Sequence, residues 1–194
     1  VGFVAFSGLY GGYQGYQTYK SYNPAPAQSS STQSPSDGAC FIAGTLVLTD
    51  NGYIPIEDIT VGTMVYSHNP ETGETNLKQV LNTFVRQSDK LVYIKVNDDE
   101  ITTTPTHPFW VIDKGWTDAK YLKSGYVLQL VNGDCAVISE VVHINLNEPI
   151  TVYNFEVDDF HTYHVGLNCI LVHNANCGYT APNGGGGVTA SINV

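Results

Sequence analysis

Two groups whose chemistry suits cleavage of a peptide bond stand at the borders of one segment of this chain. Cys40 carries a thiol directly after Ala39, and Asn174 carries a carboxamide directly before Ala175. A thiolate can attack the carbonyl that precedes it and convert the amide into a thioester, an N-to-S acyl shift. A side-chain amide can attack its own main-chain carbonyl, form a succinimide and release the next amine. Both groups therefore lie beside bonds that they could break in their own chain.

The tetrapeptide Thr104-Pro105-Thr106-His107 falls between the two borders. Expulsion of an amine requires a proton on the scissile nitrogen, and a histidine with a pKa near 6.5 can supply it at neutral pH. His107 is the candidate for this role at the Ala39–Cys40 bond. Thr104 can offer its hydroxyl or its backbone N–H to the oxyanion, or can twist the scissile peptide.

Other histidines lie near the second border. His173 directly precedes Asn174 and can polarise its carbonyl or protonate the amine of Ala175. His161 is a second candidate for the same help. His68, next to an Asn-Pro turn, is expected to be solvated or packed instead of catalytic.

Each feature has an ordinary structural explanation when it stands alone. A single cysteine is commonly a small buried apolar residue, and an asparagine after a strand is commonly a turn former. A threonine followed by a histidine three positions later occurs often by chance. All three in order, at the borders of one segment, are more specific than any one of them. The pattern predicts a chain that is its own substrate.

The segment between the borders, residues 40–174, is predicted to be all-β. Short runs of Val, Ile, Leu, Tyr and Thr alternate with turn residues about every ten positions. The expected strands are 45–49, 63–67, 76–86, 90–97, 101–104, 126–131, 135–146, 151–157 and 169–172. The expected helical turns are 56–59 and 117–122.

The two flanks differ from this segment in composition. Residues 1–39 hold tyrosines three positions apart among glycines, followed by a Ser/Pro-rich stretch, which predicts a low-complexity spacer and a flexible linker. Residues 175–194 are rich in Gly and Asn and are predicted to be a flexible tail at the start of a cargo. The first residue is Val, so the chain is expected to be a piece of a longer polypeptide.

Charge and cysteine content narrow the possible partners. The formal net charge of −10 has the wrong sign for a phosphate backbone or an anionic lipid surface. The chain has no run of 18 apolar residues, so no membrane span is predicted. The four cysteines are expected to be free thiols, because a domain of this size needs no disulfide. We expect a monomer without cofactor or metal, whose partner is its own flanking polypeptide.

Taken together, the border motifs resemble the successive blocks of Hint domains, the superfamily of inteins, hedgehog autoprocessing domains and bacterial intein-like domains. The blocks are Cys40-Phe41-Ile42-Ala43-Gly44-Thr45, the Thr104 to His107 tetrapeptide, Val152-Tyr153-Asn154-Phe155-Glu156-Val157, His161-Thr162-Tyr163 and Ile170-Leu171-Val172-His173-Asn174. The likeness is greatest to the pretoxin Hint domains of bacterial polymorphic toxins. It implies an all-β horseshoe fold with pseudo-twofold symmetry that brings the two borders together.

The resemblance also implies roles and a setting. It implies Cys40 as the nucleophile, Thr104 and His107 as activators of the first bond, and His161 and His173 as assistants to Asn174. In this setting the cuts, with water or an external thiol as acceptor, release a C-terminal toxin or effector from a larger secreted or cell-surface bacterial protein.

Two departures from the family pattern matter. Many inteins have an aspartate where this chain has Asn154, so a charge that tunes the cysteine or links the two steps is missing. Splicing inteins place Cys, Ser or Thr directly after the asparagine, whereas Ala175 has no nucleophile. Ordinary ligation of the flanks is therefore expected to fail.

Three alternatives stay open at this point. The first is residual, low-efficiency splicing in which Cys177 intercepts the thioester. The second is an inactive Hint scaffold that only spaces a carrier from its cargo. The third is a metal-binding module, because Cys169, His173 and Cys177 are spaced four apart with His164 nearby.

Overall fold

The computed structural model describes residues 38–131 and 133–174, whose regular structure is β-strands with two short 3-10 turns. The predicted all-β class is confirmed, and so are the two helical turns, which are the 3-10 turns η1 (Ile56–Asp58) and η2 (Ala119–Tyr121). The predicted flexible flanks, residues 1–39 and 175–194, lie outside the described residues except for Gly38 and Ala39, and Ala39 is buried. The strands are β1 (Phe41–Ile42), β2 (Leu46–Thr49), β3 (Gly52–Pro55), β4 (Met64–Asn69), β5 (Glu74–Val96), β6 (Asp99–Thr103), β7 (Pro108–Val111), β8 (Gly115–Asp118), β9 (Val127–Gln129), β10 (Cys135–Val157), β11 (Thr162–Val165) and β12 (Ile170–His173).

Two pairs of predicted strands are single long strands in the structure. β5 continues through residues 87–89 and β10 continues through residues 147–150, where polar residues predicted breaks. The two strands pair with each other antiparallel, and their register shifts between Asn145 and Ile150. Residues 146–149 have no ladder partner in β5, but pairing resumes at Ile150, so the chain bends there without ending the strand.

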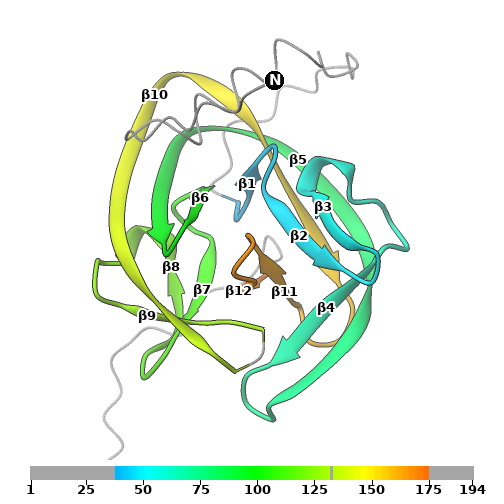
Figure 1. Cartoon of the computed structure of the whole chain (residues 1–194). Coiled ribbons are helices and arrows are strands. Elements are labelled where there is room, and N and C mark those ends of the chain that lie inside the picture. The colour runs from blue at the N-terminus through cyan, green and yellow to red at the C-terminus, as the bar shows by residue number, and fades with distance from the viewer. Residues whose placement is uncertain (1–37, 132, 175–194) are drawn as a thin grey trace, which may run out of the picture.

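The order of elements repeats along the chain. A short strand, a hairpin, a 3-10 turn and two further strands occur first as β1 to β5 with η1, and again as β6 to β10 with η2. The repeat agrees with the pseudo-twofold symmetry expected from the sequence. In Figure 1 the long strands β5 and β10 curve round the outside, while β1, β11 and β12 lie toward the centre.

Both terminal strands of the described region are interior strands of the sheet. The strand order is β11-β12-β7-β9-β10-β1-β6-β5-β4-β2-β3. β1 therefore lies between β10 and β6, and β12 lies between β11 and β7. Residues that are far apart in the sequence meet here, because each border residue extends directly from an interior strand.

An aromatic cluster fills the space between these interior strands. Phe41, Phe109, Phe155 and Tyr163 are completely or almost completely buried. The Phe155 and Tyr163 ring centroids lie 4.2 Å apart, and Phe41 meets Phe109 edge-on. Burial of each such ring stabilises the fold by roughly 1.5–3 kcal/mol, so the groups anchored on this cluster have a fixed position.

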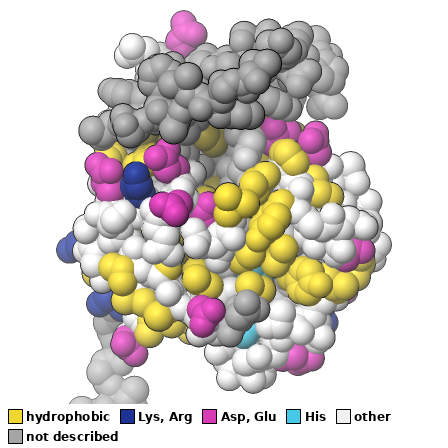
Figure 2. Space-filling view, in the orientation of Figure 1, with side chains coloured by type: hydrophobic (Ala, Val, Ile, Leu, Met, Phe, Trp, Pro, Cys, Tyr) yellow, Lys and Arg dark blue, Asp and Glu magenta, His cyan; other side chains and the backbone are white. Residues whose placement is uncertain are grey.

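The surface agrees with the acidic composition. Figure 2 shows acidic side chains spread over the visible face and few basic ones. Among the described residues, none of the helical segments has the length and apolar character needed to cross a membrane.

Candidate functional site

The turn at residues 104–107 connects the two borders of the domain. It follows β6, whose Thr103 pairs with Phe41 of β1, and it precedes β7, whose Phe109 pairs with Val172 of β12. The turn is fastened from outside by the backbone N–H groups of Ala119 and Lys120, which donate to the carbonyls of His107 and Pro105 at 2.8 and 2.9 Å. One short loop thus places its side chains between the start and the end of the domain.

The peptide bond between Ala39 and Cys40 is held on both of its polar atoms. The Cys40 N–H donates to the hydroxyl oxygen of Thr104 at 2.9 Å. On the opposite side, Nδ2 of Asn154 donates to the Ala39 carbonyl oxygen at 2.7 Å. Ala39 and Cys40 are 6% and 1% exposed, so these hydrogen bonds lie in a largely dry environment where they are strong.

Thr104 contacts the nitrogen of this bond and Asn154 its oxygen, whereas the sequence suggested Thr104 for the oxygen. The Thr104 hydroxyl faces the nitrogen of the bond and donates its own hydrogen to the Gly38 carbonyl at 2.9 Å, so it does not contact the Ala39 oxygen. Asn154, which the sequence marked only as a missing charge, supplies the donor to that oxygen. A neutral amide N–H is suited to stabilise negative charge that develops there, whereas a carboxylate is not.

His107 is completely buried, and its ring centroid lies 4.1 Å from that of Phe41. Burial lowers the pKa of His107 to about 3; the backbone of Pro108 opposes this shift, and the charge of His173 adds to it. The expectation of a pKa near 6.5 is therefore wrong for the resting state, because a charged ring would be desolvated. The ring is neutral at pH 7, so it must gain a proton before it can give one.

The nitrogens of His107 differ in their surroundings. Nε2 lies 3.2 Å from the hydroxyl of Tyr163. Nδ1 is buried and has no hydrogen-bond partner among residues 38–131 and 133–174. The Tyr163 hydroxyl in turn donates to Oδ1 of Asn154 at 2.8 Å. Tyr163 was not among the candidate residues, and its place in the His161-Thr162-Tyr163 block is the one sequence signal that could have drawn attention to it.

The Tyr163 hydroxyl also interacts electrostatically with the Cys40 thiol. Burial raises the pKa of the Tyr163 phenol well above its ordinary value, and the nearby Cys40 thiolate raises it further by repulsion. The Cys40 side chain is therefore within electrostatic reach of the group that links His107 to Asn154. The main-chain carbonyl of Cys40 is fixed by the Thr103 hydroxyl at 2.8 Å and by the Thr104 N–H at 2.9 Å.

Asn174, at the second border, is also buried and hydrogen-bonded. It is 3% exposed, and its N–H donates to the His161 carbonyl at 2.9 Å. In the orientation that satisfies its neighbours, the side-chain Nδ2 also donates to the His161 carbonyl, and Oδ1 accepts from the N–H of Val157. The carboxamide is thus fixed between the main chains of His161 and Val157 at the end of β12.

The two histidines near Asn174 contribute in different ways. The His173 ring lies edge-on to Trp116 with centroids 5.0 Å apart, and the His161 ring lies 6.3 Å away. Burial lowers the pKa of His173 to about 4, with a further decrease from the charge of His161 and an opposing effect of the Asn174 backbone. His161 has an exposed imidazole and a left-handed φ of 54°, and it reaches Asn174 through its carbonyl.

The described cysteines and histidines among those considered for metal binding, Cys169, His164 and His173, form no candidate metal site. No group of three potential metal ligands is present in residues 38–131 and 133–174. Cys169 precedes β12 and His173 ends it, which separates them by about 13 Å in an extended strand. The Cys169 thiol lies 3.2 Å from the Tyr53 hydroxyl instead. Cys177 lies outside the described residues, and the described cysteines form no disulfide.

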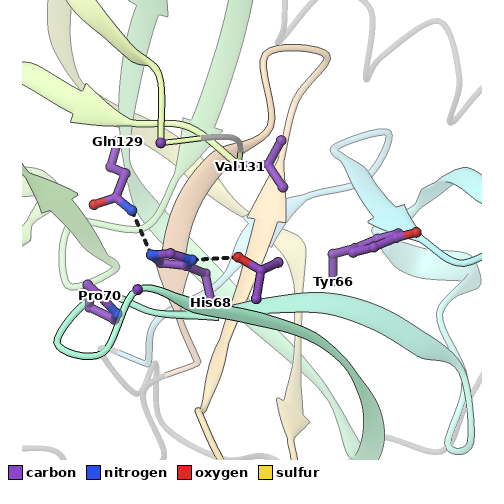
Figure 3. A pocket seen from close by; sticks show the side chains of 8 residues that line it. Tyr66, His68, Pro70, Gln129 and Val131 are labelled. Carbon is purple, nitrogen blue, oxygen red and sulfur yellow. Dashed lines mark hydrogen bonds between the residues drawn. The ribbon is translucent and has the colours of Figure 1, made fainter.

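A separate pocket of about 580 Å³ lies beside β4 and contains His68 (Figure 3). Nε2 of His68 accepts from the Gln129 amide at 2.8 Å, so Nδ1 carries the hydrogen and donates to Thr75 at 2.7 Å. Burial lowers the pKa of His68. Both ring nitrogens are satisfied, and the ring ties β4 and β5 to β9. His68 is therefore a packed residue, as the sequence predicted.

Residues 46–175 match the family model of the pretoxin Hint domain. The chain belongs to the pretoxin Hint family. This Hint domain is similar to a bacterial intein-like domain from Clostridium thermocellum, at 44% identity over 70% of this chain and 98% of that one, with a TM-score of 0.68.

Inteins share the same fold. The DnaB intein from Synechocystis sp. PCC 6803 matches with a TM-score of 0.61 at 18% identity, over 71% of this chain and 99% of that one. The gp41-1 intein matches with a TM-score of 0.57 at 26% identity, over 71% and 99% of the two chains. The Hint fold predicted from the sequence is thereby confirmed. A search of curated proteins finds no match.

Proposed function

We propose that this Hint domain cuts its own polypeptide, once and in cis, at Ala39–Cys40 and at Asn174–Ala175. The observation that carries the proposal is that side chains hydrogen-bond to both polar atoms of the Ala39–Cys40 peptide bond. Asn154 donates to its oxygen at 2.7 Å and Thr104 accepts from its nitrogen at 2.9 Å. A purely structural strand would not need a side-chain amide and a hydroxyl on the two ends of the bond that precedes its cysteine.

The first cut begins at Cys40. The thiol proton passes to the open Nδ1 of neutral His107, and the thiolate attacks the Ala39 carbonyl carbon. The oxygen takes the negative charge beside Nδ2 of Asn154. As the intermediate collapses, the carbon–nitrogen bond breaks and His107 returns its proton to the Cys40 nitrogen, which Thr104 still holds. A thioester remains, and water or an external thiol opens it.

The second cut uses the Asn174 carboxamide. Its Nδ2 attacks the main-chain carbonyl carbon of Asn174, while one Nδ2 hydrogen is directed at the His161 carbonyl. The carbon–nitrogen bond to Ala175 breaks as a succinimide forms and Nδ2 loses one proton to water. His173, after it has taken up a proton from water, delivers that proton to the departing amine, so the step is balanced. Because Ala175 offers no nucleophile, the flanks separate without ligation. In a pretoxin, this step frees whatever effector follows the domain.

The partners of the reaction are then the flanks of the chain itself and a small acceptor. Family membership favours a secreted or cell-surface bacterial protein as the setting. An inactive scaffold is disfavoured because Thr104 and Asn154 are buried and hydrogen-bonded to the two ends of the bond, although burial of polar groups costs free energy. Residual splicing through Cys177 is the second candidate, supported only by the presence of that thiol.

Intact-mass measurement of the full chain over time, with and without a small thiol, tests the proposal. We expect fragments that end at Ala39 and begin at Ala175. Cys40→Ala should abolish the first cut only, and Asn174→Ala should abolish the second only. Cys135→Ala, which removes an exposed thiol, is the control and should cut normally. Fragments that persist unchanged in both border variants would refute the assignment.

A further inference from the structure

Tyr163 joins the two groups that act on the Ala39–Cys40 bond. Its hydroxyl lies between Nε2 of His107 at 3.2 Å and Oδ1 of Asn154 at 2.8 Å. The residue is on β11 and completely buried. Its ring packs at 4.2 Å between centroids on Phe155 and edge-on at 6.4 Å on Phe41. A phenol fixed in this way can hold its oxygen at one point between two partners.

The direction of each hydrogen bond follows from the identity of the atoms. Oδ1 of Asn154 also accepts the backbone N–H of Phe155 at 2.8 Å, and Nδ2 faces a carbonyl oxygen that can only accept. The carboxamide therefore has one orientation. Its oxygen needs a donor from Tyr163, and a phenol has one hydrogen to give.

The same hydroxyl decides the tautomer of His107. Since the hydrogen of Tyr163 is used on Asn154, its oxygen can only accept from His107, so Nε2 carries the ring proton. The neutral ring then has its lone pair on Nδ1, the buried nitrogen with no partner in the described part of the chain. The opposite tautomer would leave Nε2 facing Tyr163 with nothing to accept.

We propose that Tyr163 is a positioning residue for the first cut, which holds His107 in the Nε2–H tautomer and keeps the Asn154 amide on the Ala39 carbonyl. This inference rests on the proposed function. The donors run in series from His107 through Tyr163 and Asn154 to the Ala39 oxygen. When Nδ1 gains the thiol proton, Nε2–H becomes a stronger donor and polarises the next two hydrogen bonds. A positive charge on the imidazole therefore strengthens the hydrogen bond from Asn154 to the Ala39 oxygen when that oxygen becomes negative.

Tyr163→Phe tests this role, because it removes only the hydroxyl. In the full chain with thiol, we expect the Ala39–Cys40 cut to slow 10- to 100-fold and the Asn174–Ala175 cut to change less than threefold. Tyr93→Phe, at a buried tyrosine on β5, is the matched control and should cut at the rate of the parent. In an Asn154→Ala background, Tyr163→Phe should add less than a threefold loss, because the residue acts through Asn154.

A second measurement reads the tautomer without any cleavage. In the uncut Cys40→Ala, Asn174→Ala protein, nitrogen-15 NMR of the His107 ring should show a proton on Nε2 and none on Nδ1. Addition of Tyr163→Phe should redistribute that proton between the nitrogens.

Three outcomes would overturn the inference: a normal first cut in Tyr163→Phe, equal slowing of both cuts, or an Nδ1–H tautomer in the uncut protein. If the parent chain is not cut at Ala39–Cys40, or is cut in Cys40→Ala, the proposed function fails. The NMR result then still decides whether Tyr163 sets the tautomer.

Discussion

At the scale of single residues, the first border depends on neutral hydrogen bonds instead of a buried charge. Asn154 occupies the position where many inteins carry an aspartate, and its amide reaches the oxygen of the bond to be cut. A carboxylate at the same point would repel an oxyanion. The substitution that looked like a loss in the sequence is therefore a competent donor in the folded protein.

Asn154→Ala removes this donor. We expect the Ala39–Cys40 cut to slow by about 10²–10³, the usual effect of losing one oxyanion donor, while the Asn174–Ala175 cut continues. Asn145→Ala on the exposed part of β10 is the control. Thiol-induced fragment masses give the rates, and circular dichroism checks that the variant is folded. A normal first cut in a folded Asn154→Ala protein would contradict the assigned role.

The pH dependence of the second cut follows from His173. Burial and the charge of His161 lower its pKa to about 4, so only a small fraction of the ring is protonated at pH 7. If His173 protonates the departing amine, the rate of the Asn174–Ala175 cut should increase about tenfold for each unit by which the pH is lowered from 7.5 to 6. Timed fragment masses at several pH values measure the slope. His173→Ala should be slow at every pH; the same slope in that variant would assign the proton to another group.

At the scale of elements, the β11–β12 hairpin carries residues of both centres side by side at its open end, where Thr162 pairs with His173 and Tyr163 pairs with Val172. The hairpin turn is organised by the buried carboxylate of Asp99, which accepts from the N–H groups of Leu167 and Asn168 at 3.0 and 2.6 Å. Gly166, with a φ of 74°, lets the turn approach this carboxylate, since a Cβ there would lie 2.7 Å from Oδ2.

Asp99→Ala should therefore weaken both cuts together. Removal of a buried acceptor leaves several N–H donors unsatisfied and should lower the free energy of unfolding by about 2–4 kcal/mol. Urea unfolding followed by circular dichroism measures the loss, and fragment masses measure both rates. Asp98→Ala, at the exposed neighbouring position, is the matched control. Loss of one cut alone would indicate that the hairpin does not position the two centres jointly.

The sequence predicted the elements better than the contacts between them. The period-two runs located most strands, and the border motifs located Cys40, His107 and Asn174. Polar residues in the long strands predicted breaks, but β5 and β10 pair with each other on both sides of these positions. The role of Asn154 could not be read from local pattern, because its hydrogen bond to Ala39 joins residues 115 positions apart. The lowered pKa of His107 was equally invisible, since it arises from complete burial by residues of other strands.

At the scale of the whole molecule, buried neutral histidines make the fold sensitive to acid. Burial lowers the pKa values of His107 to about 3 and of His164 and His173 to about 4. In the unfolded chain these rings take up protons below about pH 6.5, whereas in the folded chain they stay neutral. Their contribution to stability is complete above pH 6.5 and is lost as the pH falls toward 4.

Each such ring lowers the free energy of unfolding by about 1.4 kcal/mol for each pH unit in that range, at most. We expect urea midpoints of the uncut Cys40→Ala, Asn174→Ala protein to fall steeply from pH 6.5 to 4.5 and little from pH 8 to 7. His164→Phe should flatten the slope. A midpoint that stays constant down to pH 4.5 would show that the three rings are not held neutral.

The placement of the last strand inside the sheet would set the timing of the proposed second cut. The ribosome delivers β12 late, after the strands that flank its site have been made. Until that strand enters, the sheet is incomplete and the Asn174–Ala175 junction has no place between β11 and β7. If the domain cuts as proposed, topology alone would protect this junction of a nascent chain from early scission. The proposed release would act as a one-shot clock whose delay is the time the domain needs to mature.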